Sequence, residues 1–383
     1  MSTTGRSDES ASAVSDIAAQ LREAGLVRLV AAATGDAVAA AGLLTKALDA
    51  RGVAHQTSVV AMPKPAARET DADLTIALCR PSTEADVVLG GDGQPASETA
   101  LSVAAELGAV DYELALAGIY AAGTRPDSDV LAAARERGIE PRPGVASPTP
   151  DLADALAHSS LVHAPFSGRV ETTSDALEEV RVGDDRDATA TEGAQRVASM
   201  VALAVCSDEE SSPRAAEAVE RFLRPLATPG GRFETVEGYA DVLDATVRER
   251  PELAVPLSLE AIEPSDALDA WRQHTRHAHD AVRAAATGRY DGLFVARCEG
   301  DVPLGTVGRL VGDFRSPEPL VLVVADGEAV AQAVEDEHSH HVGSLLERAA
   351  TTVDGVGSGT ATRGRATFDG DPTEFVVAFR EAL

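Results

Sequence analysis

The carboxylates of Asp36 and Asp92 are the first candidates for a functional site, because of their charge and their positions in the sequence. Asp36 comes just before the helical segment AVAAAGLL, and Asp92 lies in the turn GGDGQ after a predicted strand. Ligands of open α/β sheets collect at the carboxyl ends of strands, so binding a metal or a phosphate is one role for this pair. An aspartate at a helix start is also a good N-cap, worth about 1 kcal/mol, and for Asp36 we expect capping.

Four further aspartates are candidate substitutes for a second acid beside Asp36. Asp71 and Asp73 precede their predicted strand and so belong to the opposite edge of the sheet, and Asp86 likewise opens its strand. Asp111 begins a predicted helix. Because ligands gather at the carboxyl edge, these placements favour Asp92 over the other four.

Arginines and glycines in the second half of the chain are candidates for binding phosphate or nucleic acid. Arg248 could hold a phosphate with its planar fork, although on an acidic surface we expect it to be ion-paired. Gly357 and Gly359 are expected to supply positive-φ backbone for a tight turn. Arg363 and Arg365 follow that turn, so it could also form a small anion-binding nest.

The histidines and cysteines do not form a recognisable metal site. His274, His277 and His279 belong to one predicted helix, where only the first two share a face. The group at 337–341 (EHSHH) is expected to be an exposed loop, since no separated acid or cysteine completes a ligand set. The three cysteines are far apart and are expected to be small buried hydrophobes in a reducing compartment. They are Cys79, Cys206 and Cys298.

The composition describes a water-soluble, acidic chain. Among 383 residues, 62 are Asp or Glu against 33 Lys or Arg, which gives a net charge of −29, and 44% are apolar. Lys46 and Lys64 are the only lysines. This acidic, lysine-poor pattern resembles proteins of extreme halophiles. At molar salt the Debye length is about 3 Å, so the charge neither excludes nor supports nucleic-acid binding.

No stretch reaches the roughly 18 apolar residues of a membrane span, and the polar start MSTTGRSDESASAVSD does not resemble a signal peptide. We therefore expect no membrane association and a cytoplasmic location.

Strands alternating with helices predict an α/β fold with a parallel sheet covered by helices on both faces. The first predicted strand is VRLVAAA (27–33), and a smaller, strand-rich α/β unit follows a long helix near 265–287. We expect four parts, with a variable insertion at 124–230 inside the second. They are a polar flexible tail (1–25), a main domain (26–260), a connector helix (261–288) and a C-terminal domain (289–383).

The order of five segments resembles the DHH phosphoesterase superfamily, and within it RecJ-like exonucleases and the archaeal GINS-associated nuclease. TGDAVAAAGLLTKAL (34–48) looks like the first motif, Asp-x-Asp-Gly entering a helix, and ADLTIALC (72–79) like the second-motif strand. Residues 96–123 look like the helix pair before a Gly-x-x-x-Asp ligand. LDATVR (243–248) stands where such nucleases have Asn-Ala-x-Gly-Arg. VGSGTATRGRATF (356–368) is similar to the Gly-Gly-Gly-His turn of the DHH-associated domain.

The departures from these motifs predict that catalysis is lost. A DHH enzyme holds two Mn²⁺ or Mg²⁺ ions between clustered Asp and His, and one carboxylate cannot hold both. Here Asp36 survives from the first motif, while no Asp-His-His triplet occurs. The other ligand positions align with Thr34, Cys79 or Arg80, Ala122 and Thr360.

Three functional hypotheses follow from these observations. The first is a catalytically degenerate RecJ/DHH-like protein, without a cofactor, that binds single-stranded DNA or bridges replisome partners; the resemblance implies GINS and the MCM helicase. The second is an active 5′-to-3′ single-strand exonuclease or small-nucleotide phosphoesterase with displaced ligands, which would need Mn²⁺ or Mg²⁺. The third is an unrelated α/β ligand-binding protein, which the scarcity of aromatic residues (3%) slightly favours because single-strand binders stack bases on aromatic rings.

Overall fold

The computed structural model describes residues 3–60, 71–79, 85–91, 93–182, 190–334 and 341–383. The chain divides into two compact units. Unit 1 comprises Met1–Pro141 and Leu226–Trp271, and unit 2 comprises Arg142–Pro225 and Arg272–Leu383. The sequence had placed the break near 260–290. It did not anticipate that residues 142–225 pack with the C-terminal part, because this depends on contacts between segments far apart in the chain.

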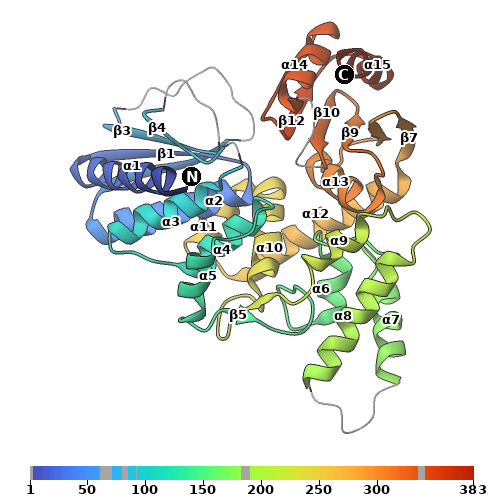
Figure 1. The fold of residues 1–383 in the computed structure, drawn as a ribbon, viewed down its shortest axis with the longest axis horizontal. Helices are drawn as coiled ribbons and strands as arrows, with labels where there is room; N and C mark the ends of the chain where they lie inside the picture. Colours follow the sequence, from blue (N-terminus) through green and yellow to red (C-terminus); the bar gives the residue numbers. More distant parts are fainter. Residues whose placement is uncertain (1–2, 61–70, 80–84, 92, 183–189, 335–340) are drawn as a thin grey trace. The chain divides into compact units, whose positions relative to one another are not determined.

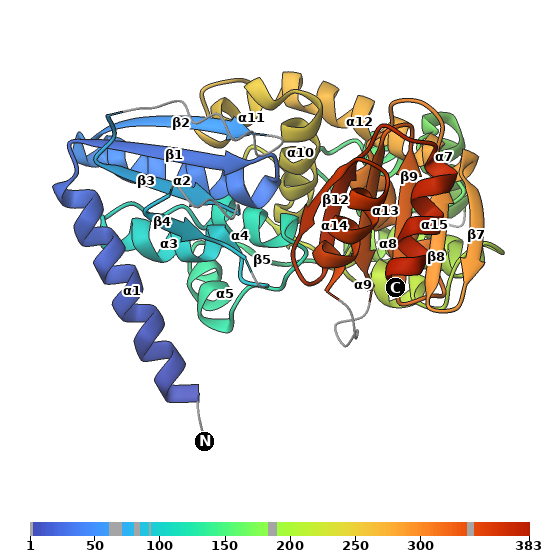
Figure 2. The same cartoon turned by 90° about the horizontal axis from the view of Figure 1, so that it is seen from above.

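Unit 1 is built on a four-stranded parallel sheet. Its strands are β1 (Leu26–Ala32), β2 (Ala54–Val60), β3 (Leu74–Leu78) and β4 (Val87–Leu89). They lie in the order β2-β1-β3-β4, as Figure 2 shows. All three pairings are parallel, so the carboxyl ends of the strands share one edge. The prediction of a parallel sheet flanked by helices is confirmed.

The helices of unit 1 follow most of the predicted segments. The N-terminal stretch differs, because α1 forms where a polar tail was expected; Ile17, Ala18 and Leu21 are buried in the core of the unit. A short pairing of β5 (Glu140–Pro141) with β6 (Leu226–Ala227) completes the unit. The helices are α1 (Thr3–Glu23), α2 (Gly35–Arg51), α3 (Ala96–Glu106), α4 (Tyr112–Ala121), α5 (Ser128–Arg135), α10 (Val236–Glu249) and α11 (Pro251–Ser258).

Helix α2 is the central helix of unit 1, and its small residues let its neighbours approach closely. Residues 35–45 are all buried. A Cβ at Gly42 would lie 2.6 Å from Ser258 Oγ, and one at Gly118 of α4 would lie 2.6 Å from the Cβ atoms of Ala39 and Ser97. Since real Cβ contacts are not that short, these glycines permit the packing of α2 and α4 that brings the ends of several elements together.

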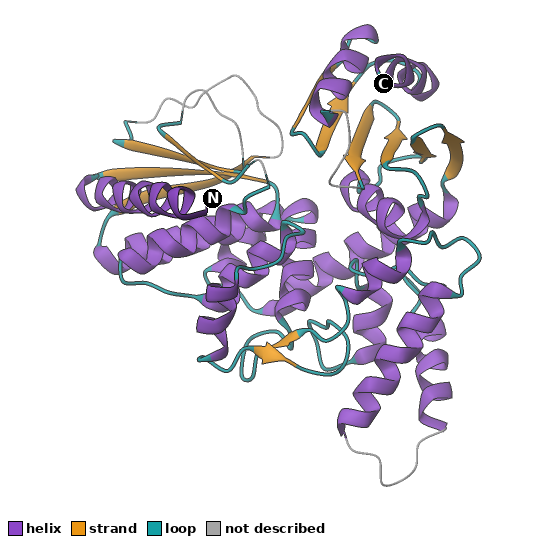
Figure 3. Ribbon diagram, viewed as in Figure 1, coloured by secondary structure: helices purple, strands orange, loops and turns teal. Residues whose placement is uncertain are grey.

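Unit 2 combines helices with a mixed sheet, and Figure 3 shows its helices in purple and its strands in orange. The strand order is β11-β12-β10-β9-β8-β7, with only the β8–β9 pair parallel. The strands are β7 (Ala286–Tyr290), β8 (Leu293–Arg297), β9 (Leu320–Ala325), β10 (Glu328–Ala333), β11 (Val356–Gly359) and β12 (Arg363–Thr367).

Helix α12 (Pro264–Ala284) contains the chain boundary between the units, after Trp271. None of the helices in the described residues is long and apolar enough to cross a membrane. The other helices of unit 2 are α6 (Leu152–His158), α7 (Val170–Val182), α8 (Ala190–Cys206), α9 (Ala215–Glu220), α13 (Leu304–Leu310), a π-helical turn (Val311–Arg315), α14 (Val342–Thr352) and α15 (Pro372–Ala382).

Candidate functional site

The carboxylate of Asp36 is buried, with 5% of the residue exposed, and binds the start of another helix. Oδ1 accepts from the Ser97 amide (2.8 Å) and the Ser97 hydroxyl (2.6 Å), and Oδ2 accepts from the Ala96 amide (2.9 Å). These amides open α3, whose positive dipole end favours a negative charge. Asp36 therefore caps α3.

The expected role of Asp36 as the cap of its own helix is wrong. The N-cap of α2 is Thr34, which has extended backbone and accepts from the Ala37 amide at 3.3 Å through its hydroxyl. Asp36 lies two residues further on, inside the first turn. From there its side chain accepts from the amides at the N-terminus of α3.

Cys79 supplies a fourth donor to Asp36. Its Sγ lies 3.0 Å from Asp36 Oδ2, and the thiol donates to the carboxylate. The backbone of Cys79 is left-handed (φ 55°), a conformation that turns the chain sharply at the end of β3. Burial, and then the charge of Asp36, raise the pKa of the thiol far above its usual range, so the group stays protonated. Cys79 is one of the two residues that the resemblance aligns with a ligand acid, and it is a neutral hydrogen-bond donor here.

Asp244 on α10 is a second carboxylate beside the start of α2. Its Oδ1 accepts from the Gly35 amide at 2.9 Å. The same carboxylate receives two hydrogen bonds from Arg248, Nε to Oδ2 at 3.0 Å and Nη2 to Oδ1 at 3.1 Å. The charge of Asp244 raises the pKa of Arg248. Arg248 is thus held by an acid on its own helix.

These residues do not fit a two-metal centre. The carboxylate of Asp36 already accepts four hydrogen bonds, and that of Asp244 is bound to an amide and a guanidinium. Within the ranges that the structure describes, no group of three or more His, Cys, Asp or Glu could hold a metal ion. Asp92 lies outside the described residues. Hard cations need several free anionic oxygens, which the described residues do not provide here.

Three of the four other aspartates proposed as substitutes have structural partners. Asp73 accepts from the amides of Gly25 and Leu26, both at 2.9 Å, at the amino end of β1 as expected. Asp86 accepts from the Thr75 amide at 2.7 Å, next to the start of β3. Asp111 caps α4 and also binds Lys46 (2.7 Å from Nζ to Oδ2). Asp71 is exposed before β3.

The glycine-rich hairpin of β11 and β12 differs from its expected geometry. Neither Gly357 nor Gly359 has a positive φ. Both belong to β11, and their lack of a side chain allows close backbone contacts instead: a Cβ on Gly357 would overlap the Leu346 carbonyl of α14, and one on Gly359 would overlap the Arg363 carbonyl across the hairpin. Gly357 therefore serves helix–strand packing, and Gly359 allows the close approach of the two strands.

The polar groups of this hairpin are engaged with neighbours. The Thr360 hydroxyl accepts from the amides of Thr362 (3.3 Å) and Arg363 (3.2 Å), which closes the turn. Arg365 donates to Glu328 across the sheet at 2.6 Å. At this hairpin the anion nest of the sequence analysis stays a prediction.

Two of the three histidines of α12 are buried and hydrogen-bonded. His274 is buried, with Nε2 2.8 Å from Thr306 Oγ1, while His277 is exposed. His279 is buried, and its Nδ1 lies 2.9 Å from Nδ1 of His163. Of the 337–341 group only His341 is described; its Nδ1 caps α14 by accepting from the Ser344 amide. The remainder lies outside the described residues.

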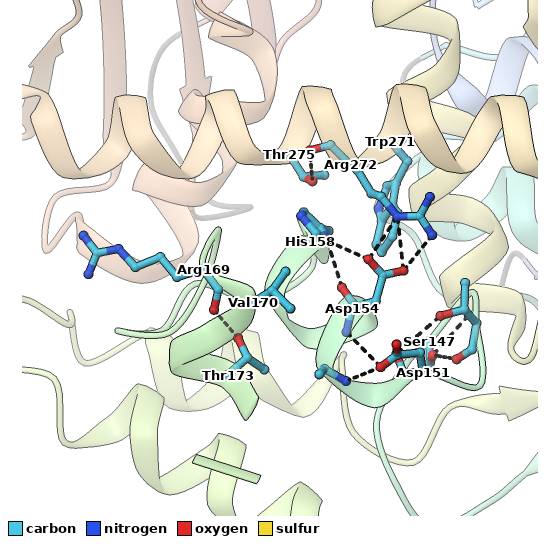
Figure 4. A network of polar contacts seen from close by, with 12 residues as sticks. Ser147, Asp151, Asp154, His158, Arg169, Val170, Thr173, Trp271, Arg272 and Thr275 are labelled. Atoms are coloured by element: carbon cyan, nitrogen blue, oxygen red, sulfur yellow. Dashed lines mark hydrogen bonds and ion pairs between the residues drawn. The ribbon is translucent and has the colours of Figure 1, made fainter. Parts of the chain in front are cut away.

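A polar network in unit 2 attaches α6 to α12 (Figure 4). The Asp154 carboxylate accepts hydrogen bonds from Arg272 Nε at 2.9 Å and from Arg272 Nη2 at 2.8 Å. Its Oδ1 also lies 3.0 Å from His158 Nδ1. Burial opposes ionisation of Asp154, but the bonds from His158 and Arg272 outweigh it and lower the pKa of the carboxyl. Because His158 is 2% exposed, this network stabilises the fold rather than presenting a reactive group.

Ser97 and Asp244 are the residues of this site that sequence reasoning missed. From the sequence, Ser97 is predicted only as part of a helix, and Asp244 only as part of the segment LDATVR. A serine at the start of a small-residue helix, and an aspartate four residues before an arginine, were the available signals.

Solved structures with this fold share little sequence with the chain. CDC45 from Entamoeba histolytica aligns with a TM-score of 0.60 and 10% identity, over 97% of this chain and 99% of that one. Exonuclease RecJ bound to manganese aligns at 0.53 and 14%, over 98% and 92%. The DHH domain of a member of a family of ribosomal proteins aligns at 0.50 and 11%, over 100% and 92%. The chain thus has the RecJ/DHH-like fold.

At the level of sequence, a family model described as "Uncharacterized protein rrnAC1427, C-terminal domain" matches residues 285–381. The protein rrnAC1427 of Haloarcula marismortui is 50% identical over 385 residues, covering 100% of both chains. The chain belongs to the rrnAC1427 family.

Proposed function

We propose that this protein is a catalytically degenerate member of the RecJ/DHH-like class that works by binding, as a scaffold or single-stranded DNA binder in DNA replication or repair. One observation carries the proposal: Asp36 uses its carboxylate to cap α3 and to accept from Cys79. An acid committed to four donors is not free to hold a cation.

The surroundings of Asp36 support the same conclusion. Two-metal hydrolysis requires both ions to bridge the attacking and leaving oxygens of a phosphodiester, and hence several converging acids. Here the side chains bonded to Asp36 are the thiol of Cys79 and the hydroxyl of Ser97. The carboxylate of Asp244, which accepts from the Gly35 amide, is ion-paired with Arg248. A Cβ at Gly35 would lie 2.7 Å from the Cβ of Ala121, so side chains close this region tightly.

A nuclease assay tests the loss of catalysis. End-labelled single-stranded DNA is incubated with the full chain, Mn²⁺ or Mg²⁺ and molar KCl. We expect no degradation above that of an Asp36→Asn variant. Processive 5′-to-3′ degradation by the wild type that Asp36→Asn abolishes would support the exonuclease reading instead and would overturn the proposal.

A binding assay tests the positive half of the proposal. The likeness of fold to CDC45 and RecJ supports a nucleic-acid-related role, and GINS and the MCM helicase are the proposed partners. We expect enrichment of GINS or MCM subunits on the immobilised chain, or saturable binding of labelled single-stranded DNA, at molar KCl. If a folded sample shows neither enrichment of these subunits nor binding of single-stranded DNA, an unrelated ligand-binding protein becomes the better description.

The conditions of that assay follow from the composition. We propose a cytoplasmic protein of a salt-rich cell, because 62 acidic residues against 33 basic ones keep a surface hydrated in concentrated salt. No resident cofactor is expected; Mn²⁺ or Mg²⁺ would be required only by the nuclease alternative.

A further inference from the structure

A cavity of about 420 Å³ lies within unit 1, away from Asp36. Its walls come from α2, the loop between α3 and α4, the start of α4, the segment before β5, the loop after β6 and the end of α11. The volume is that of a small-molecule site or a pocket for one long side chain. The residues used below are Lys46, Asp111, Tyr112, Glu113, Arg137 and Glu260.

Lys46 is the one lysine in the described part of the chain, and two acids of the cavity hold it. Its Nζ lies 2.7 Å from Asp111 Oδ2 and 3.0 Å from Glu260 Oε1. Its ammonium is therefore committed to these carboxylates and is not offered to an anionic ligand. Asp111 is further fixed by capping α4 through the Leu114 amide.

Glu113 is the cavity acid that remains without a partner. No hydrogen bond or ion pair to its carboxylate forms among the described residues, although the side chain is half-buried beside Gly231. Burial and the charges of Asp111 and Glu260 raise the pKa of Glu113 to about 7, against the opposing effect of Lys46 and Arg232. The same cluster also perturbs the buried Tyr239 hydroxyl and the ammonium of Lys46. A cation placed beside Glu113 would stabilise the ionised form of this half-buried, unpaired carboxylate.

The aromatic wall of the cavity already accommodates a guanidinium. Arg137 lies over the ring of Tyr112, 5.7 Å from Cζ to the ring centroid. Such stacking is typical of planar cations. Of the cations near these carboxylates, Lys46 binds Asp111 and Glu260. Arg137 lies over Tyr112, and Arg232 donates to the carbonyls of Leu257 and Ile262, so none of the three is hydrogen-bonded to Glu113.

We propose that this cavity binds the guanidinium of a ligand against Glu113 and the ring of Tyr112. A metal ion is a poorer occupant, because Asp111, Glu113 and Glu260 do not converge as a ligand group in the described structure. A planar cation carried on a flexible stem suits a site in which the acid lies inside and the aromatic ring lines the wall. The proposal does not depend on the function proposed above.

The guanidinium can belong to a free small molecule or to an arginine of a partner protein, and the test distinguishes the two. Isothermal titration at molar KCl uses agmatine and the blocked tripeptide acetyl-Gly-Arg-Gly-amide as probes. The matched peptide with citrulline in place of arginine has almost the same shape without the charge. Binding of the arginine peptide alone assigns the site to a protein segment, and binding of agmatine assigns it to a small molecule; either result supports the proposal.

Two controls make the assignment specific to Glu113. Glu113→Gln is expected to weaken probe binding about tenfold or more, because a charge-assisted hydrogen bond is lost. Glu136→Gln, an exposed carboxylate next to Arg137 that does not line the cavity, is expected to leave binding unchanged. In the wild type, binding near pH 7 releases protons, so the measured heat changes with the ionisation enthalpy of the buffer.

Three results would overturn the proposal. They are no binding of either probe, equal binding of the citrulline peptide, and equal affinity in Glu113→Gln whose thermal unfolding matches the wild type. If Glu113→Gln is unfolded, the proton release of the wild type decides: binding with none at a pH near 7 contradicts an ionising Glu113 in contact with the cation.

Discussion

The thiol of Cys79 donates a hydrogen bond to the carboxylate of Asp36, with 3.0 Å between Sγ and Oδ2. The two residues are 43 positions apart and follow neighbouring strands, β1 and β3, at the carboxyl edge of the sheet. At this edge ligands of α/β proteins usually bind. In this chain the Cys79 thiol, the Asp36 carboxylate and the first amides of α3 form hydrogen bonds with one another at this edge.

Replacing Asp36 should therefore affect stability more than any reaction. Asp36→Asn removes the charge and leaves the amides of Ala96 and Ser97 with a poorer acceptor in a buried place, which we expect to cost about 3 kcal/mol of unfolding free energy. Urea unfolding at fixed molar KCl measures it. Asp16→Asn, at an exposed position of α1, should stay within about 0.5 kcal/mol. Equal stability of the two variants would show that the cap contributes little.

Cysteine alkylation provides an independent view of the same contact. Burial and the charge of Asp36 raise the pKa of Cys79, and burial raises that of Cys298 to about 11, so neither forms the reactive thiolate near neutral pH. Cys206 is exposed at the end of α8. Iodoacetamide followed by peptide mapping should modify Cys206 alone in the native protein and all three cysteines in urea. Rapid native modification of Cys79 would contradict the burial of the thiol beside Asp36.

The elements of unit 1 could be predicted because each has a strong local signal. The small-residue run after Gly35 predicts α2, and Gly52, with φ 69°, ends it. Helix α1 was missed because its apolar residues are few and lie in a polar sequence; Leu21 becomes buried only against the rest of the unit. Propensity does not contain that tertiary contribution.

The candidate site was less predictable, because its bonds join distant parts of the chain. Asp36 and Ser97 are separated by 61 positions, and Gly35 and Asp244 by 209. The sequence correctly placed Asp36 beside a helix N-terminus but chose the wrong helix. A shift of two residues, from Asp36 to Thr34, changes which helix a capping side chain can reach.

Acidification should destabilise unit 2 through the pair of His163 and His279. Arg315 donates to Nε2 of His163 (3.1 Å), so His163 Nδ1 carries the hydrogen and donates to Nδ1 of His279, whose Nε2–H donates to the Ser159 carbonyl (2.9 Å). Both rings are therefore neutral in the folded state. Burial lowers the pKa of His279 to about 3; burial, then His279 and Arg315, lower that of His163 to about 2.

The sign of the pH effect follows from proton binding. In the unfolded chain both histidines bind protons below about pH 6.5, whereas the folded state does not, so stability falls as the pH decreases from 6.5. The slope is at most about 1.4 kcal/mol per pH unit for each histidine. Urea unfolding between about pH 7 and pH 5 measures it, above the range in which most carboxylates titrate. Glu113, with its pKa raised to about 7, titrates in this range with the opposite sign, so the comparison between variants isolates the histidine. His163→Gln, which can both accept and donate, should lower the slope by the share of one histidine; an unchanged slope would assign it to other groups.

The glycines of β11 allow a test of packing against ligand binding at the C-terminal hairpin. Gly357→Ala places a methyl group against the Leu346 carbonyl of α14, a backbone atom that cannot rotate away, and should destabilise unit 2 by about 1–3 kcal/mol. Gly288→Ala in β7 is the matched control: its Cβ would meet only the Tyr290 ring, at 3.5 Å, and the change should stay within about 0.5 kcal/mol. Amide hydrogen exchange of β11 and β12 resolves the effect locally. If Gly357→Ala leaves that exchange unchanged but weakens binding of single-stranded DNA, the hairpin contacts nucleic acid, and packing is not the reason for its glycines.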